Sequence, residues 1–298
     1  MFDWLHITLP PAQAMFGQLL VGLINGAFYA MLSLGLAIIF GLLNIINFTH
    51  GAQYMLGAFC AWFLLNGLGI GYWPALIVAP IAVGIVGIVI EQVFLKRIAK
   101  LDHLYGLLLT FGLALIIEGG FREAYGSSGM PYVIPPELQG VRNLGFMYLP
   151  NYRAWVIFAS LAVCLTTWFV IERTRLGALL RAATENPVLV QAFGINVPRL
   201  VTLTYGGGVA LGALAGVLAA PIYQVRPQMG SDIIIVVFAV VVIGGMGSIL
   251  GAIVSGFALG LIEGLTKVFY PEASNTVIFV IMALLLLIKP AGLFGRRA

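Results

Sequence analysis

The sequence predicts an all-α polytopic integral membrane protein, with about eight or nine membrane elements in one domain over residues 1–298. Of its residues, 61% are hydrophobic and only 9% are charged, whereas about a quarter of an ordinary soluble domain is charged. Uncharged apolar stretches recur along the chain, and glycine accounts for 37 residues, as in closely packed membrane helices. This composition excludes a soluble globular protein, a disordered chain, a fibre and a nucleic-acid-binding protein.

Apolar segments follow one another along the whole chain, and each predicts a membrane element. They cover residues 16–41, 48–66, 73–95, 104–122, 153–171, 200–222, 232–246, 249–268 and 276–289. Several are shorter than the ~20 residues that a spanning helix needs. We therefore expect the pieces at 44–66 and 232–246 to be broken or re-entrant.

Glycines at four-residue spacing mark two of these segments as tightly packed. Gly208, Gly212 and Gly216 share one helical face, and the same spacing recurs from Gly256 to Gly264. Small residues let helix backbones approach in lipid, where no hydrophobic force drives helices together. The pattern favours static packing over a moving interface.

Basic residues predict how the chain is oriented in the membrane. The first Lys or Arg is Lys96, and basic residues then cluster at 96–100, 173–199 and 289–297. Cytoplasmic loops carry an excess of Lys and Arg. We therefore expect a periplasmic N-terminus, external loops at 123–152 and 222–232, a cytoplasmic loop at about 172–199 and a cytoplasmic C-terminal tail at 290–298.

A stripe of polar residues is expected near the start of the second segment. Asn44, Asn47, His50 and Tyr54 are spaced by three or four, so a helix would present all four on one face. Polar groups in a bilayer avoid lipid and are candidates for function. They are candidates for the wall of a translocation path, and the alternative is hydrogen bonding between neighbouring helices.

Three glutamates lie within or near the apolar segments. Glu263 precedes Lys267 by four residues, Glu118 precedes Arg122 by four, and Glu91 lies shortly before the basic cluster at 96–100. Acid before base at this spacing favours an ion pair within one helix. Ion pairing at the membrane edge explains all three, and a place for Glu263 or Glu118 at the mouth of a path is the alternative.

The basic loop at 172–199 contains the signals of a short helix. Asn186 followed by Pro187 is typical of a cap and a first helical position, and Gly194 is a stop signal. The enclosed residues offer an apolar face beside Arg181 and Glu185, made by Val188, Leu189, Ala192 and Phe193. Such a helix suits the groove of a partner protein, or else it lies on the membrane surface.

Catalytic and metal-binding motifs are missing from the sequence. No Gly-x-x-x-x-Gly-Lys loop, His-Glu-x-x-His or Gly-x-Ser-x-Gly is present, so the chain is not expected to be an enzyme or to bind a cofactor. Cys60 and Cys164 lie inside apolar runs, where they predict neither a disulfide nor a metal site.

Three ordered motifs resemble a known family. They are Asn47-Phe-Thr-His-Gly51, the loop from Arg181 to Asn196, and Gly244-Gly-Met-Gly-Ser-Ile-Leu-Gly-Ala252. Together they resemble the LivH-type permeases of branched-chain amino acid ABC importers, over nearly the whole chain from about residue 16 to the Pro290–Gly295 tail. Thr49 departs mildly from the family's usual alanine.

The resemblance implies a permease subunit of the bacterial inner membrane that forms part of a path for branched-chain or related amino acids. It implies a LivM-like second permease, two cytoplasmic ATPase subunits that carry the ATP and Mg, a periplasmic solute-binding protein and surrounding lipid. Similar permeases serve urea and amides. The residues implied in ATPase coupling are Arg181, Glu185, Asn186, Pro187, Leu189, Phe193, Gly194 and Asn196, and the path candidates are Asn44, Asn47, His50, Tyr54 and Glu263.

Two other classes of protein fit the residues alone. A self-sufficient proton-coupled carrier or channel for a small polar solute suits the glutamates and the polar stripe, and it would transport without nucleotide or partner subunits. A structural subunit of an energy-transducing membrane complex would carry no solute flux.

Overall fold

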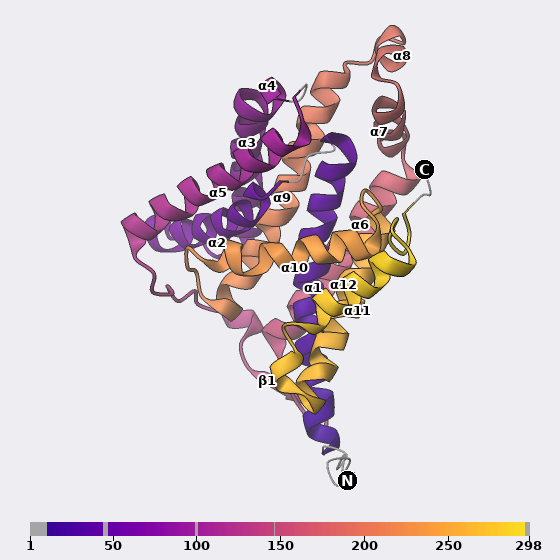
Figure 1. Cartoon of the computed structure of the whole chain (residues 1–298). Helices are drawn as coiled ribbons and strands as arrows, with labels where there is room; N and C mark the ends of the chain where they lie inside the picture. The colour runs from indigo at the N-terminus through magenta and orange to yellow at the C-terminus, as the bar shows by residue number, and fades with distance from the viewer. Residues whose placement is uncertain (1–10, 44–46, 99–100, 146, 296–298) are drawn as a thin grey trace.

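The computed structural model describes residues 11–43, 47–98, 101–145 and 147–295, and it confirms the all-α membrane fold. Within these residues, every apolar segment of the sequence forms a helix (Figure 1). These helices are α1 (Ala12–Leu43), α2 (Thr49–Leu68), α3 (Tyr72–Ile90), α5 (His103–Tyr125), α6 (Asn151–Arg173), α9 (Val197–Tyr223), α10 (Met229–Gly244), α11 (Ile249–Phe269) and α12 (Val277–Ile288).

The helices differ in whether they are long enough to cross a bilayer. In the described part of the chain, six candidate spans meet the criteria of length and hydropathy: Ala12–Gly41, Tyr72–Ile98, His103–Tyr125, Asn151–Arg173, Val197–Tyr223 and Ile249–Phe269. Helix α10 has 16 residues and α12 has 12, so they are only about 24 and 18 Å long, against a hydrocarbon core of about 30 Å. The expected short element at 232–246 is therefore α10, whereas α2 is continuous over its 20 residues.

Short elements and loops cap the two ends of the bundle. A π-helical turn, η2 (Glu91–Leu95), leads from α3 into α4 (Lys96–Ile98), while α7 (Arg175–Glu185) and α8 (Pro187–Ala192) join α6 to α9. The strands β1 (Val141–Asn143) and β2 (Tyr148–Pro150) pair antiparallel between α5 and α6. Turns η3 (Pro136–Leu138) and η4 (Pro271–Ala273) complete the elements.

The described residues of the first two basic clusters lie at one end of the molecule. Helices α4 and α8 both lie at the top of Figure 1, whereas the start of α1 and β1 lie at the other end. We call the side with α4, α7 and α8 the basic end. Because α9 starts next to α8 and runs through 27 residues, its last residue lies far from the basic end.

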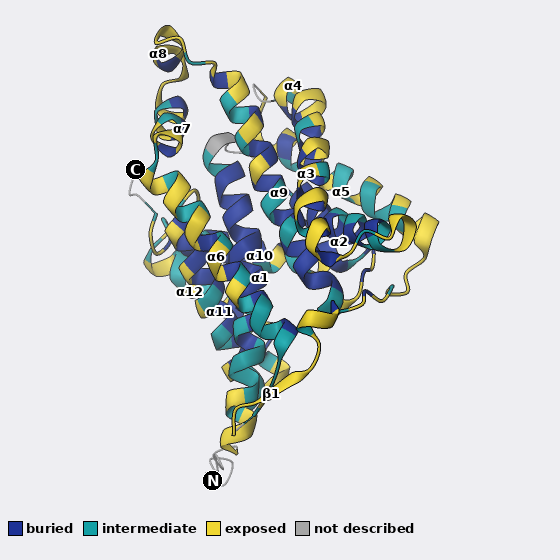
Figure 2. Cartoon of the chain, turned by 180° about the vertical axis from the view of Figure 1, so that it is seen from behind, coloured by how far each residue is buried: buried dark blue, intermediate teal, exposed yellow. Residues whose placement is uncertain are grey.

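Helices α1 and α9 form the centre of the bundle. Helix α1 packs along α11, and α9 packs against α1, α2 and α3. In Figure 2 these central helices are largely buried, whereas α5 and α6 expose much of their surface. The share of each span buried inside the chain is 11% for α5 and 17% for α6, so their apolar faces are left for lipid or a neighbouring subunit.

The glycine stripes lie where helix backbones meet, as predicted. A Cβ atom on Gly260 would be 2.4 Å from the Gly26 backbone, and one on Gly216 would be 2.0 Å from the Tyr54 carbonyl oxygen. A Cβ atom on Gly212 would be 2.8 Å from the His50 ring. Because real Cβ atoms do not approach so closely, these positions require glycine.

The C-terminal tail is bonded to the last turn of α10. The Leu293 amide donates to the Ile243 carbonyl oxygen at 2.8 Å, and the Phe294 amide donates to the Gly244 carbonyl oxygen at 3.0 Å. These bonds satisfy carbonyls that the end of a helix leaves without an intrahelical partner.

Candidate functional site

A cavity of about 230 Å³ lies where the link from α9 to α10 crosses α1 and α2. A single water needs only about 10–15 Å³ on a comparable measure, so the cavity has room for a small solute. Its lining combines apolar, aromatic, amide and charged side chains: Asn25, Phe28, Tyr29, Tyr54, Tyr223, Arg226, Met229, Asp232, Ile233 and Val236.

One cation and one carboxylate lie together on the cavity wall. Arg226 Nη2 is 2.6 Å from Asp232 Oδ2, and the two side chains are 46% and 52% exposed. Asp232 lies in the first turn of α10, where the helix dipole stabilises a negative charge. The pair makes the cavity polar on one side without giving it a net charge.

The backbone that carries Arg226 is held in a defined shape. Gln224 has a φ of 62°, the one positive value of a non-glycine residue among the described residues. Val225 and Met130 exchange two backbone hydrogen bonds, at 2.8 and 2.9 Å. The loop after α5 therefore fixes the turn that presents Arg226 to the cavity.

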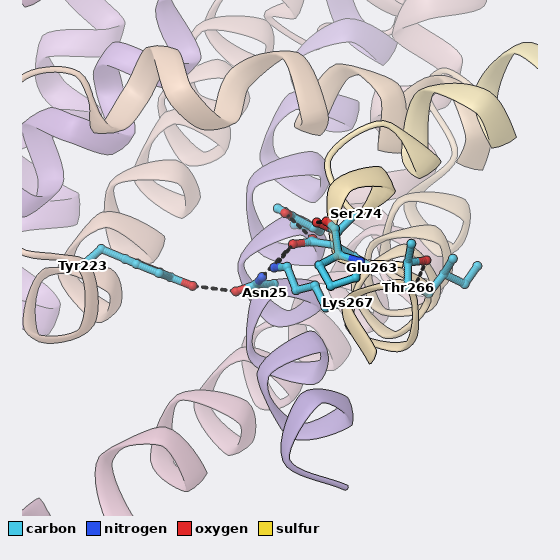
Figure 3. Close-up of polar contacts among 9 residues, drawn as sticks. Asn25, Tyr223, Glu263, Thr266, Lys267 and Ser274 are labelled. Carbon is cyan, nitrogen blue, oxygen red and sulfur yellow. Dashed lines mark hydrogen bonds and ion pairs between the residues drawn. The ribbon is translucent and has the colours of Figure 1, made fainter. Parts of the chain in front are cut away.

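A hydrogen-bonded network links two residues of the lining, Asn25 and Tyr223, to Glu263 on α11 (Figure 3). The Tyr223 hydroxyl donates to Asn25 Oδ1 at 2.7 Å, and Asn25 Nδ2 donates to Glu263 Oε1 at 3.2 Å. Tyr29 donates to Glu263 Oε2 at 2.7 Å. Lys267 forms an ion pair with the same carboxylate, as the four-residue spacing predicts. Glu263 does not line the cavity itself, but its hydrogen bonds position Asn25 and Tyr29, which do.

The other members of the polar stripe differ in their surroundings. Tyr54 lines the cavity. Asn47 and His50 are fully buried, with Asn47 Nδ2 donating to the Tyr205 hydroxyl at 3.1 Å and His50 Nε2 donating to the Leu32 carbonyl oxygen at 3.1 Å. Asn47 Oδ1 and His50 Nδ1 have no partner among the described residues. Their place on the path stays a prediction, and Asn44 lies outside the described residues.

The loop at the basic end contains the predicted short helix, α8. Asn186 Oδ1 accepts from the Leu189 amide at 3.0 Å, and Gly194 ends the helix with a φ of 82°. Val190 points inward and packs with Ala183 and Val197. The predicted apolar face is left open, because Val188 and Phe193 are each 77% exposed and Leu189 is 53% exposed, while Ala192 is also exposed.

Other coupling candidates hold the loop together. Arg181 donates to the Ile171 carbonyl oxygen at 3.0 Å and lies 3.4 Å from Glu172, which fixes α7 against α6. Asn196 Oδ1 accepts from the Arg199 amide and caps α9. Glu185, at the end of α7, and Pro187, at the start of α8, are exposed. The ATPase role of all these residues stays a prediction.

Sequence reasoning missed several features of these two sites. It did not single out Asn25, Tyr29, Tyr223, Arg226 or Asp232, although Arg226 and Asp232 are charges within an otherwise apolar region. It did not predict α7, whose buried residues recur at three-residue spacing. For Glu91 the expected basic partner is replaced by the Thr202 hydroxyl, which donates to it at 2.8 Å.

Sequence comparison identifies the family. Residues 18–288 match the family described as "Branched-chain amino acid transport system / permease component". The chain belongs to this permease family. The branched-chain amino acid permease BraD of Pseudomonas aeruginosa is 29% identical over 97% of this chain and 98% of its own length. LivH of Escherichia coli K12 is 29% identical over 94% and 95% of the two chains.

The chain is also related to a second type of permease, LivM. LivM of Escherichia coli K12 is 25% identical over 89% of this chain and 67% of its own length. BraD, LivH and LivM are all named as permease proteins of high-affinity branched-chain amino acid transport systems. The family is one of transport components and not of enzymes, as the missing catalytic motifs predict.

Proposed function

We propose that this permease is a subunit of an ATP-binding cassette importer in the bacterial inner membrane and forms part of the path for branched-chain or related amino acids. The observation that carries the proposal is the family match over residues 18–288. A cavity with both charged and apolar walls is consistent with a solute that has a zwitterionic head and an apolar side chain.

The proposed complex contains four further subunits. A LivM-like permease completes the membrane part, two cytoplasmic ATPases bind ATP and Mg, and a periplasmic binding protein delivers the solute. The exposed apolar face of α8 supports an ATPase contact, because an apolar helix face in water is a liability unless a partner covers it. Closure of the ATPases on nucleotide would move α7 and α8 and tilt the attached helices α6 and α9.

The test of this function is uptake by the assembled complex. With all subunits reconstituted in proteoliposomes, leucine uptake should require ATP and the binding protein, and a hydrolysis-deficient ATPase should abolish it. Equal uptake by the permease alone, without nucleotide or partners, would favour the self-sufficient carrier. An assembled complex without any solute flux would favour the structural subunit.

The proposed orientation has a cytoplasmic basic end and a periplasmic N-terminus. The common location of α4 and α8 at one end of the molecule (Figure 1) supports it, because positive charge is retained in the cytoplasm. Single cysteines at Glu185 and at Lys289, in a chain without Cys60 and Cys164, should react with an impermeant thiol reagent only from the cytoplasmic side. A cysteine at Val141, which is 60% exposed, should react only from the periplasm. Periplasmic labelling at Glu185 would contradict this orientation.

A further inference from the structure

We propose that the cavity at the α9–α10 link is the site where this permease receives its solute, a zwitterionic α-amino acid with an apolar side chain. Arg226 would bind the solute carboxylate and Asp232 its ammonium group, at the end of α9 that lies far from the basic end. This inference rests on the proposed function and adds to it a site within the permease itself.

Charge complementarity is the first argument. The two groups are 2.6 Å apart, so together they leave the wall neutral. A zwitterion inserted between them pairs both of its charges, whereas an amine or a carboxylate alone leaves one protein charge unpaired. A charge left unpaired beneath a bound solute is costly, because the solute keeps water away from it. The pair therefore selects for net-neutral solutes that carry both charges.

The ion pair is also weak enough to open. Its side chains are about half exposed, and ion pairs with this exposure contribute little to stability because water screens them. Exchanging the Arg226–Asp232 contact for two contacts with the solute therefore costs little. Weak binding of this kind suits transport, because the solute must leave the site again.

The rest of the lining matches the apolar part of such a solute. Phe28, Met229, Ile233 and Val236 make up the apolar part of the lining. Small-molecule sites typically combine such apolar walls with a few placed polar groups. The unbranched Met229 side chain adapts to different shapes, which favours a class of aliphatic side chains over a single one.

The uncharged polar groups of the lining are preorganised by Glu263. This carboxylate accepts from Asn25 and Tyr29 and pairs with Lys267, so its oxygens are occupied. The bond from Tyr223 to Asn25 Oδ1 and the bond from Asn25 Nδ2 to Glu263 fix the orientation of the Asn25 amide. Glu263 is thus a positioning residue of the wall.

The experiment measures leucine uptake and cavity access in the complete complex. Arg226→Gln and Asp232→Asn should each lower ATP-dependent leucine uptake by at least about tenfold, the effect of losing one charged hydrogen bond. The double variant removes both charges, and its leucine uptake should be as low as that of the single variants. Arg142→Gln, an exposed arginine on β1 outside the cavity, is the matched control and should transport normally.

A second readout reports on the cavity directly. In a complex without other reactive cysteines, Ile233→Cys should react with a small thiol reagent, and millimolar leucine should slow that reaction. Isoamylamine and 4-methylpentanoate, which each lack one charged group, should not slow it. Adding Arg226→Gln should remove the protection by leucine.

The outcomes separate this inference from the proposed function. If the unmodified complex shows no ATP-dependent uptake, the proposed function fails. If it transports but Arg226→Gln transports normally, or leucine gives Ile233→Cys no protection, the site is elsewhere. Recovery of uptake in the double variant would also overturn the inference. The loss of uptake in the single variants would then come only from the unpaired charge that each leaves, and not from a lost contact with the solute.

Discussion

Phe193→Asp should abolish ATP-dependent uptake by the assembled complex while the permease inserts and folds normally. The side chain is 77% exposed in the free chain, so the substitution removes no internal contact of any weight. In the proposed ATPase groove, however, it would place a carboxylate where an apolar anchor is needed. Central aromatic anchors of interfaces contribute more than about 2 kcal/mol, which corresponds to a roughly thirtyfold loss of ATPase affinity.

The measurement is copurification of the ATPase subunits with the permease, together with ATP hydrolysis stimulated by the loaded binding protein. Gln191→Asp is the matched control, because Gln191 is an exposed residue of the same helix that lies away from the apolar face. It adds the same charge and should leave assembly intact. A Phe193→Asp complex that assembles and transports like the unmodified one would show that α8 is not the coupling element, and would favour its lying on the membrane surface.

Gly260→Leu should prevent the permease from folding stably. A Cβ atom there would lie 2.4 Å from the Gly26 backbone and 2.4 Å from the Gly22 carbonyl oxygen, and backbone atoms cannot move aside as a flexible side chain does. Helices α1 and α11 would have to separate along their shared length. Overpacking costs roughly 1–3 kcal/mol even where side chains can adjust, so we expect a larger loss here.

This loss is measured as the yield of monodisperse permease in detergent and its thermal midpoint. Gly207→Leu is the control, because a Cβ atom at this exposed position of α9 would have no atom within 4 Å beyond its chain neighbours and the adjacent backbone of its own helix. Both variants add the same side chain to a glycine in a long helix. Equal yields and midpoints would mean that the contact between α1 and α11 does not limit stability.

The apolar helices and α8 were predictable from sequence because each rests on a local signal. Apolar stretches located the helices, Asn186 and Gly194 bounded α8 through their cap and left-handed turn, and the spacing of Glu263 and Lys267 predicted their ion pair. Glycine spacing likewise located the contacts between helices. Each signal lies within a few residues of the feature that it predicts.

The cavity was not predictable, because it is assembled from distant parts of the chain. Periodicity placed His50 and Tyr54 on one helical face, but it could not distinguish a neighbouring helix from an open cavity. In the structure His50 lies against Gly212, whereas Tyr54 borders the cavity. The turn that presents Arg226 to Asp232 is shaped by the positive φ of Gln224 and by the pairing of Val225 with Met130. No pattern within one segment contains that information.

The attachment of the tail to α10 has a mechanical consequence. At its first turn α10 carries Asp232, and at its last turn it is bonded to Leu293 and Phe294. A helix of 16 residues is stiff over this length, so it behaves as a strut between the cavity and the tail. A displacement of the tail is therefore expected to pass along α10 to the wall of the cavity, where the first turn of the helix carries Asp232 and is bonded to the Arg226 carbonyl oxygen. The cavity and the tail are thus joined mechanically by a single helix.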